Sequence, residues 1–99
     1  MTEGGWTLTG YCPCAKCCGK SDGITASGYK LSDSDHLKVC AAPSKFGFGT
    51  VININGGWSG TVTVRDRGGS IQGKRLDIFH KTHQEALVFG TKYNCTISY

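Results

Sequence analysis

Apolar and polar residues alternate along several short stretches of the chain, and glycines separate most of these stretches. Strict alternation is typical of a β-strand with one buried face. On this basis the sequence predicts six strands, at residues 6–11, 38–42, 51–54, 61–64, 76–79 and 95–99. The turn sequence Asn55-Gly56-Gly57 joins the third and fourth of them and favours a hairpin, because glycine adopts positive φ angles without steric cost.

One stretch has the pattern of a short helix instead. Thr82 is a good N-cap residue, Glu85 stands where it completes a capping box, and an apolar run at 86–89 precedes Gly90. The predicted fold class is therefore all-β with one short helix. Because so few short strands would leave unpaired edges exposed in an open sheet, we expect them to close into a small β-barrel.

Size and composition fit one globular domain that spans residues 1–99, since single cores typically occupy about 100–150 residues. The 15 glycines far outnumber the two prolines, which favours tight turns over disorder. A formal net charge of +4 suits an anionic partner. Lysine and arginine do not form a block interleaved with aromatic residues, so we expect no nucleic-acid partner.

The hydropathy pattern predicts no membrane insertion. No apolar run approaches the roughly 20 residues that a membrane-spanning helix needs. Residues 1–6 also lack the charged and apolar regions of a signal peptide. We therefore expect either a chain made in the cytoplasm or a domain of a larger exported or phage-borne protein.

The six cysteines favour an oxidising compartment or a metal site in so short a chain. The Cys14-x-x-Cys17 spacing is that of a zinc knuckle, but a strong zinc signature needs a second, distant pair of ligands. We favour disulfides or structural thiols with undetermined pairing over a structural zinc and over redox chemistry. The zinc candidates lie in the N-terminal loop at 12–18: Cys12, Cys14, Cys17 and Cys18. The disulfide candidates are these four together with Cys40 and Cys95.

The histidines do not have the spacing of a metal site. His36 lies in a polar segment, residues 30–37, that we expect to be an exposed connector. His80 and His83 flank the start of the predicted helix, where a solvated or capping role is typical. No glycine array resembles a phosphate-binding loop. We therefore expect no cofactor.

Two aspartates, Asp66 and Asp77, stand eleven positions apart at the edges of apolar, strand-like runs, with three glycines between them. Burial and a like-charged neighbour both raise a carboxyl pKa, and this is how proteins make a general acid that keeps its proton near neutral pH. The alternative is a purely structural role, in which both are turn-forming residues beside glycine. The spacing alone leaves both interpretations open.

The same stretch carries a resemblance to a known family. Residues 66–79 read D-R-G-G-S-I-Q-G-K-R-L-D-I-F. They match the core D-x-G-G-x-I-x-G-x-x-[IL]-D-x-[YF] of the 3D (Asp-Asp-Asp) domain, which occurs in membrane-bound lytic transglycosylase A and the stationary-phase survival muralytic proteins. Upstream, residues 9–11, 23–28 and 48–50 resemble the family's T-A-Y strand, G-I-T-A-T-G loop and P-L-G-T step. The resemblance covers roughly the whole chain.

The resemblance implies a six-stranded double-psi β-barrel that cleaves the β-1,4 bond between N-acetylmuramic acid and N-acetylglucosamine. In this chemistry an aspartic acid protonates the glycosidic oxygen. Its carboxylate then takes the proton of the muramic C6 hydroxyl as that oxygen attacks C1, and a 1,6-anhydro product forms without water. The implied partner is the glycan strand of peptidoglycan. The implied location is extracellular, at the cell wall or on a phage particle.

Carried over position by position, the resemblance assigns roles to individual residues. The catalytic acid falls on Asp77, and Asp66 is the neighbouring carboxylate that holds its pKa and geometry. Tyr11 and Thr25 are expected to line the cleft. The other expected substrate contacts are Gly68, Gly69, Lys74 and Arg75, of which Lys74 or Arg75 would meet a sugar or peptide carboxylate.

Two features depart from the family pattern. The step V-A-V-D-P reads V-C-A-A-P at residues 39–43, so Ala42 stands where the family has its first aspartate and can perform no acid–base chemistry. The cysteine-rich loop is also outside the core pattern. We favour a lytic transglycosylase with two aspartates. The alternatives are a non-catalytic glycan-binding module on the same barrel and a hydrolytic glycosidase, in which two carboxylates flank a water.

Overall fold

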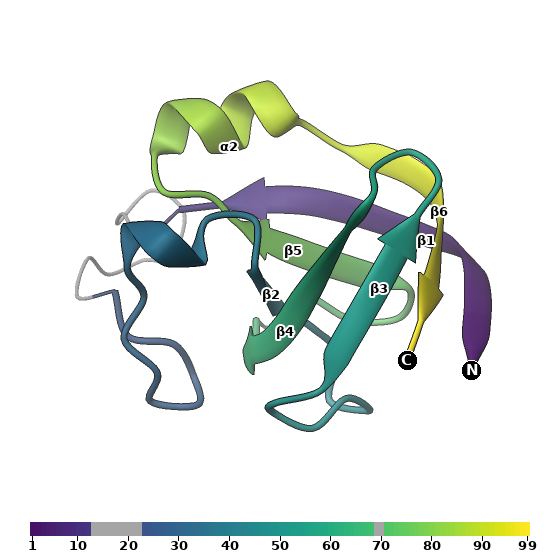
Figure 1. The fold of residues 1–99 in the computed structure, drawn as a ribbon, viewed down its shortest axis with the longest axis horizontal. Helices are drawn as coiled ribbons and strands as arrows, with labels where there is room; N and C mark the ends of the chain where they lie inside the picture. The colour runs from purple at the N-terminus through teal and green to yellow at the C-terminus, as the bar shows by residue number, and fades with distance from the viewer. Residues whose placement is uncertain (13–22, 69–70) are drawn as a thin grey trace.

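The computed structural model describes residues 1–12, 23–68 and 71–99 (Figure 1). Each predicted strand is present; the first, fourth and last extend further than the alternation suggested, and the second is shorter. One α-helix, α2, lies among the described residues at His83–Phe89, and one 3-10 turn, η1, lies at Asp33–Asp35. The strands are β1 (Thr2–Tyr11), β2 (Val39–Ala41), β3 (Val51–Asn55), β4 (Gly60–Asp66), β5 (Arg75–Phe79) and β6 (Lys92–Ser98).

The strands form a closed barrel in the order β1-β5-β2-β4-β3-β6. The β1–β5 and β2–β4 pairs are parallel, and the other four pairs are antiparallel. The prediction of a small closed barrel is therefore confirmed. Helix α2 lies across one end of it, above β1 and β5 (Figure 1). No helix in the described part of the chain is both long and apolar enough to cross a membrane.

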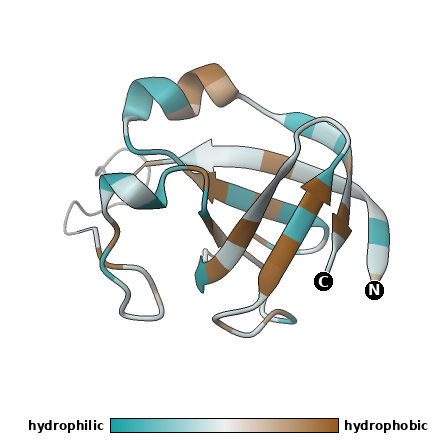
Figure 2. Cartoon of the chain, in the orientation of Figure 1, coloured by the Kyte–Doolittle hydropathy of each residue, from teal (hydrophilic) through white to brown (hydrophobic). Residues whose placement is uncertain are grey.

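Alternation along the strands divides the apolar side chains between two clusters. The larger one fills the barrel interior, and Figure 2 shows its hydrophobic positions alternating with hydrophilic ones along the strands. A smaller cluster lies on the outer face of β1, β2 and β5, where Ile71 and Leu31 cover it. The interior members are Trp6, Leu8, Cys40, Ala42, Phe46, Ile52, Ile54, Val62, Val64, Leu76, Ile78, Cys95 and Ile97.

Local signals place the turn and the helix as expected. Gly56 and Gly57 both adopt positive φ angles, of 77° and 72°, in the turn between the antiparallel strands β3 and β4. The Thr82 hydroxyl accepts a hydrogen bond from the Glu85 amide at 3.1 Å and caps α2. Gly90, at φ 64°, ends the helix. The hairpin turn, the Thr82 N-cap and the end at Gly90 are confirmed, whereas the Glu85 carboxylate, expected to complete a capping box, lies 3.1 Å from His36 Nε2.

Candidate functional site

Four residues from adjacent strands lie side by side across the barrel wall. Thr9 of β1 pairs with Asp77 of β5, Asp77 pairs with Ala41 of β2, and Ala41 pairs with Asp66 of β4. We call these four residues the aspartate row. Since neighbouring strands lie roughly 4.8 Å apart, the backbones of the two aspartates are separated by about 10 Å. The two acids that the sequence motif singled out are thus brought to one level of the barrel.

The aspartate row faces the outside of the barrel. Leu76 and Ile78 are fully enclosed in the interior, so Asp77 between them points outward. Asp66 reaches the same face because the register of β2 and β4 shifts: Cys40 pairs with Val64, but the next residue, Ala41, pairs with Asp66. The shift skips Arg65. Such irregularities re-aim side chains, and here one turns a carboxylate toward its partner acid.

Asp77 is half-buried and has the environment of an acid that keeps its proton. Burial raises the pKa of its carboxyl above the ordinary value, and the charge of Asp66 adds to this rise. Two contacts oppose it: the Thr9 hydroxyl donates to Asp77 Oδ1 at 3.0 Å, and the Arg75 guanidinium lies nearby. The net direction is upward. This side chain can therefore act as a general acid at a higher pH than a solvated aspartate.

Asp66 is held by backbone amides, whereas Asp77 is held by a side-chain hydroxyl. The Oδ1 atom of Asp66 accepts hydrogen bonds from the backbone amides of Ala26 at 2.9 Å and Arg67 at 2.8 Å. The first of these bonds attaches the loop at residues 23–31 to the end of β4. Asp66 therefore combines a fixed orientation with a negative charge that acts on Asp77.

Thr25 and Tyr11, which we expected in the cleft wall, have little exposed surface. Thr25 is buried, and its hydroxyl contacts Ser27 Oγ at 2.9 Å and accepts from the Tyr29 amide at 3.2 Å. Tyr11 is buried with its ring edge-on to Phe79, 5.8 Å between centroids. Their burial does not fit the expectation that they line a cleft: Tyr11 packs against Phe79, and Thr25 precedes Ala26, whose amide contacts Asp66.

The cationic candidates differ in position. Arg75 Nη2 donates to the Thr9 hydroxyl at 3.4 Å, so a chain of contacts runs from Arg75 through Thr9 to Asp77. Lys74 is exposed, and its ammonium donates to the Gly4 carbonyl at 3.0 Å. Gly68 is exposed at the end of β4, and Gly69 lies outside the described residues.

Ala42 does not belong to the aspartate row. Its side chain is fully buried in the interior cluster, and its carbonyl accepts from Arg67 Nη1 at 3.2 Å. The position where the family has its first aspartate is thus enclosed by apolar groups in this chain. The outer-face residue of β2 at the site is Ala41, which separates the two acids and carries no polar group.

The cysteines fall into three groups. Cys40 and Cys95 are free thiols buried in the barrel interior, and burial, reinforced by the Asp77 charge, raises the pKa of Cys40 to about 12. Cys12 is buried with its sulfur 3.6 Å from His83 Nδ1. The remaining candidates for a disulfide or zinc, Cys14, Cys17 and Cys18, lie outside the described residues. Within the described ranges no three histidine, cysteine or acidic side chains are placed to hold a metal.

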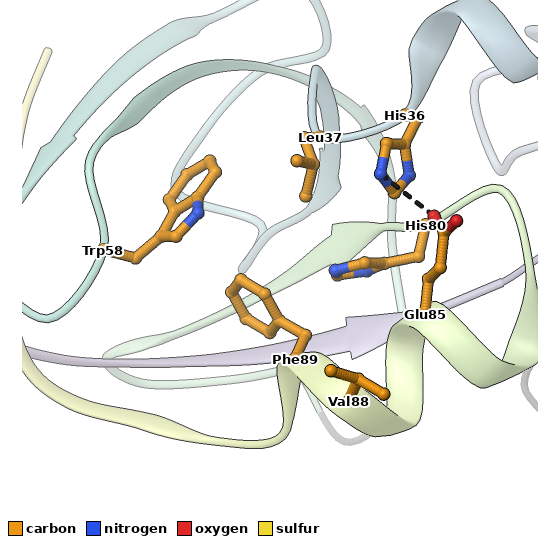
Figure 3. A pocket seen from close by; sticks show the side chains of 7 residues that line it. All are labelled: His36, Leu37, Trp58, His80, Glu85, Val88 and Phe89. Atoms are coloured by element: carbon orange, nitrogen blue, oxygen red, sulfur yellow. Dashed lines mark ion pairs between the residues drawn. The ribbon is translucent and has the colours of Figure 1, made fainter.

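Sequence reasoning missed a second feature, which we call the histidine pocket. It has a volume of about 340 Å³ and lies between α2, the segment after η1 and the β3–β4 turn (Figure 3). The expectation that His80 has a solvated or capping role is wrong, because its side chain is buried. The pocket gathers residues far apart in the chain, and no spacing indicates it. They are His36, Leu37, Trp58, His80, Glu85, Val88 and Phe89.

Comparisons with known proteins agree with the barrel and its motif. The sequence model of the family described as "3D domain" matches residues 39–99. The cell wall-binding protein YocH of Bacillus subtilis (strain 168) is 32% identical over 75 residues, which is 75% of this chain. The chain spans only 25% of the length of that relative.

Two solved structures share the fold. The crystal structure of MltA from E. coli superimposes with a TM-score of 0.59 at 21% identity, over 75% of this chain and 26% of MltA. The Streptomyces papain inhibitor gives a TM-score of 0.66 at 18% identity, over 99% of this chain and 93% of the inhibitor. The expected double-psi barrel is therefore confirmed. The fold alone does not decide what the chain does, because differently named proteins share it.

Proposed function

The chain belongs to the 3D domain family, and we propose that it acts on peptidoglycan as a lytic transglycosylase that cleaves the β-1,4 bond between N-acetylmuramic acid and N-acetylglucosamine. One observation carries the proposal: Asp77 is a half-buried acid on the outer barrel face, with a raised pKa and with Asp66 acting on it. The relative that is named as cell wall-binding supports the same substrate. The chain would act at the cell wall or from a phage particle.

In the first step, the protonated Asp77 carboxyl gives its proton to the glycosidic oxygen, and the bond from that oxygen to C1 of N-acetylmuramic acid breaks. Asp77 is left as a carboxylate. The negative charge of Asp66 favours the protonated form of Asp77 before this transfer.

In the second step, the Asp77 carboxylate takes the proton of the muramic C6 hydroxyl, and the C6 oxygen forms a bond to C1. The product is a 1,6-anhydro sugar, Asp77 regains its proton, and no water is consumed. One carboxyl thus serves as acid and then as base, so the reaction does not need a second acid–base group.

The neighbours of Asp77 have positioning roles in this scheme. The Thr9 hydroxyl occupies Oδ1, which leaves Oδ2 to carry the catalytic proton. We propose that Arg75, which contacts Thr9, meets a carboxylate of the muramic lactyl group or of a stem peptide. Lys74, Gly68 and Gly69 are proposed as further substrate contacts.

The second candidate is a glycan-binding module without turnover. Ala42 supports it, since the third carboxylate of the family name is absent, and so does the relative's name, which mentions only binding. In that case the aspartate row would recognise the sugar hydroxyls through charged acceptors. Binding and cleavage share the surface and differ in whether Asp77 transfers its proton.

Mass spectrometry of the soluble products from peptidoglycan sacculi tests the proposal. Anhydro-muropeptides are expected from the wild type and absent with Asp77→Asn, which keeps the shape of the side chain and removes its acidic proton. Asp33→Asn is the matched control, because Asp33 is exposed on η1, outside the aspartate row. Reducing-end products would indicate a hydrolase. Sacculus binding without any product would favour the binding module.

A further inference from the structure

The histidine pocket is separate from the aspartate row, none of whose residues line it. Its walls are largely apolar: Trp58 and Phe89 meet edge to face with 5.9 Å between ring centroids, and Leu37 and Val88 complete the lining. Figure 3 shows these side chains arranged around a common space. Its volume of about 340 Å³ lies at the lower end for ligand sites, which suits one ring rather than an extended molecule.

His80 lines this space and is itself almost fully buried. Its Nδ1 atom lies 2.8 Å from the Ile78 carbonyl oxygen, which can only accept, so Nδ1 carries the proton. Burial also lowers the pKa of His80, which favours the neutral ring. The other nitrogen, Nε2, is then a bare acceptor. It is buried and has no hydrogen-bond partner among the described residues, and Figure 3 shows it directed between Trp58 and Phe89.

The other polar groups of the pocket are His36 and Glu85, which lie at ion-pair distance, although Glu85 Oε2 accepts no hydrogen bond from the described residues. His36 Nδ1 accepts from the Lys81 amide at 3.0 Å, so its proton lies on Nε2, which faces Glu85 Oε2 at 3.1 Å. The Glu85 charge is thereby directed at His36. The ammonium of Lys92 lies over the Phe89 ring at 5.2 Å from its centroid. The pocket therefore suits an uncharged ligand.

An unpartnered buried acceptor costs about 1–3 kcal/mol, and a ligand that donates to it recovers this free energy. We propose that the histidine pocket is a second saccharide site, which holds one sugar ring with its C–H face against Trp58 and Phe89 while a hydroxyl donates to His80 Nε2. The choice of a sugar rests on the proposed function, since peptidoglycan supplies amino sugars at this surface. The pocket itself would hold a ring away from the point of cleavage.

The test is an NMR titration of 15N-labelled protein with N-acetylglucosamine. We expect shifts of the Trp58 indole N–H and of the His80 Nε2 resonance, whose bare nitrogen would become hydrogen-bonded. Val88→Trp should abolish both, because residue 88 lines the pocket and is 75% exposed, so a larger ring blocks the space without entering the core. Leu87→Trp is the matched control, since Leu87 is 62% exposed and does not line the pocket.

Several outcomes would overturn the proposal: no shift at Trp58, equal binding by Val88→Trp, or shifts only around Thr9 and Arg75. Stronger shifts with phenol than with the sugar would also do so, because phenol offers the same donor without a saccharide C–H face. Asp77→Asn separates this proposal from the proposed function. It should lose turnover and keep the Trp58 shifts. If the wild type shows the Trp58 shifts but releases no anhydro product, the proposed transglycosylase activity is rejected and the proposed saccharide site stands.

Discussion

The aspartate row and the histidine pocket are built on one barrel by opposite means. In the row, four neighbouring strands place two carboxyl groups on the outer barrel face, and hydroxyl or amide donors hold each acid. In the pocket, residues from four separate segments line a largely apolar hollow beside a bare nitrogen. The row is thus suited to moving a proton. The pocket is suited to holding a neutral ring, so chemistry and recognition are separable in this molecule.

Rates of product release should separate the two regions most clearly. Asp77→Asn should lower the rate of anhydro-muropeptide release by roughly 10²–10⁴-fold, the usual contribution of a general acid. Val88→Trp should leave kcat unchanged, because residue 88 contacts neither acid. Initial rates on sacculi at saturating substrate measure both variants. A comparable loss of kcat in Val88→Trp would show that the regions are one site.

The two aspartates should also differ in what they contribute to stability. Asp66→Ala leaves the amides of Ala26 and Arg67 without their acceptor, so we expect a loss of about 1–3 kcal/mol in the free energy of unfolding. Among the described residues, Asp77→Ala releases only the Thr9 hydroxyl, which can turn toward the Leu76 carbonyl, and it should cost less. Urea denaturation of both variants measures this difference. Equal losses would contradict the anchoring role of Asp66.

The two regions also differ in how far the sequence predicts them. Asp66 and Asp77 lie in one local motif, and alternation predicted their strands because each strand buries a single face. Their partner Thr9 was missed, since it depends on the parallel pairing of β1 with β5, 68 positions away. The register shift beside Arg65, which turns Asp66 outward, is likewise set by the pairing with β2. Motif and alternation carry no such information.

The histidine pocket was not predictable for a related reason. His80 was expected to be solvated because it follows a strand and precedes a helix, as many exposed histidines do. It is buried because Gly10, on the neighbouring strand, has no side chain: a Cβ there would lie 2.8 Å from His80 Cε1. A glycine 70 positions earlier thus makes the room. Only the folded barrel relates the two residues.

Gly10 therefore provides a way to disturb the pocket from within the same strand as Thr9. Gly10→Ala should displace His80 and cost about 1–3 kcal/mol, since the added Cβ would also lie 3.2 Å from the Ala86 carbonyl oxygen. Thermal unfolding and the N-acetylglucosamine titration measure the two effects. Gly4→Ala, also on β1, is the control, because its Cβ would meet only Thr96 Oγ1 at 3.8 Å. Unchanged stability and sugar binding in Gly10→Ala would refute this account of His80.

Thr9→Val tests the aspartate row through the pKa of Asp77. The Thr9 hydroxyl lowers the pKa of Asp77, so its removal should raise that pKa further. The rate of a general acid falls as pH rises through its pKa, and the basic limb of kcat/KM should therefore move to higher pH. A pH profile of anhydro-product release measures the shift. A shift to lower pH, or none, would mean that another group sets this limb.

The smallest effect concerns stability as a function of pH. The pKa of Asp77 is raised above its ordinary 3.8 mainly by burial, so the folded protein binds this proton more tightly than the unfolded chain. The resulting stabilisation is complete below the unfolded pKa and is lost as pH rises through the folded value. Asp77→Asn does not titrate, and it should match the wild type in acid and become the more stable protein toward neutral pH. Urea unfolding across this range, with Asp33→Asn as control, measures the difference. A variant that instead lost stability relative to the wild type as pH rose would mean that the folded barrel favours the Asp77 carboxylate, and Asp77 would then be a poor acid for the proposed reaction.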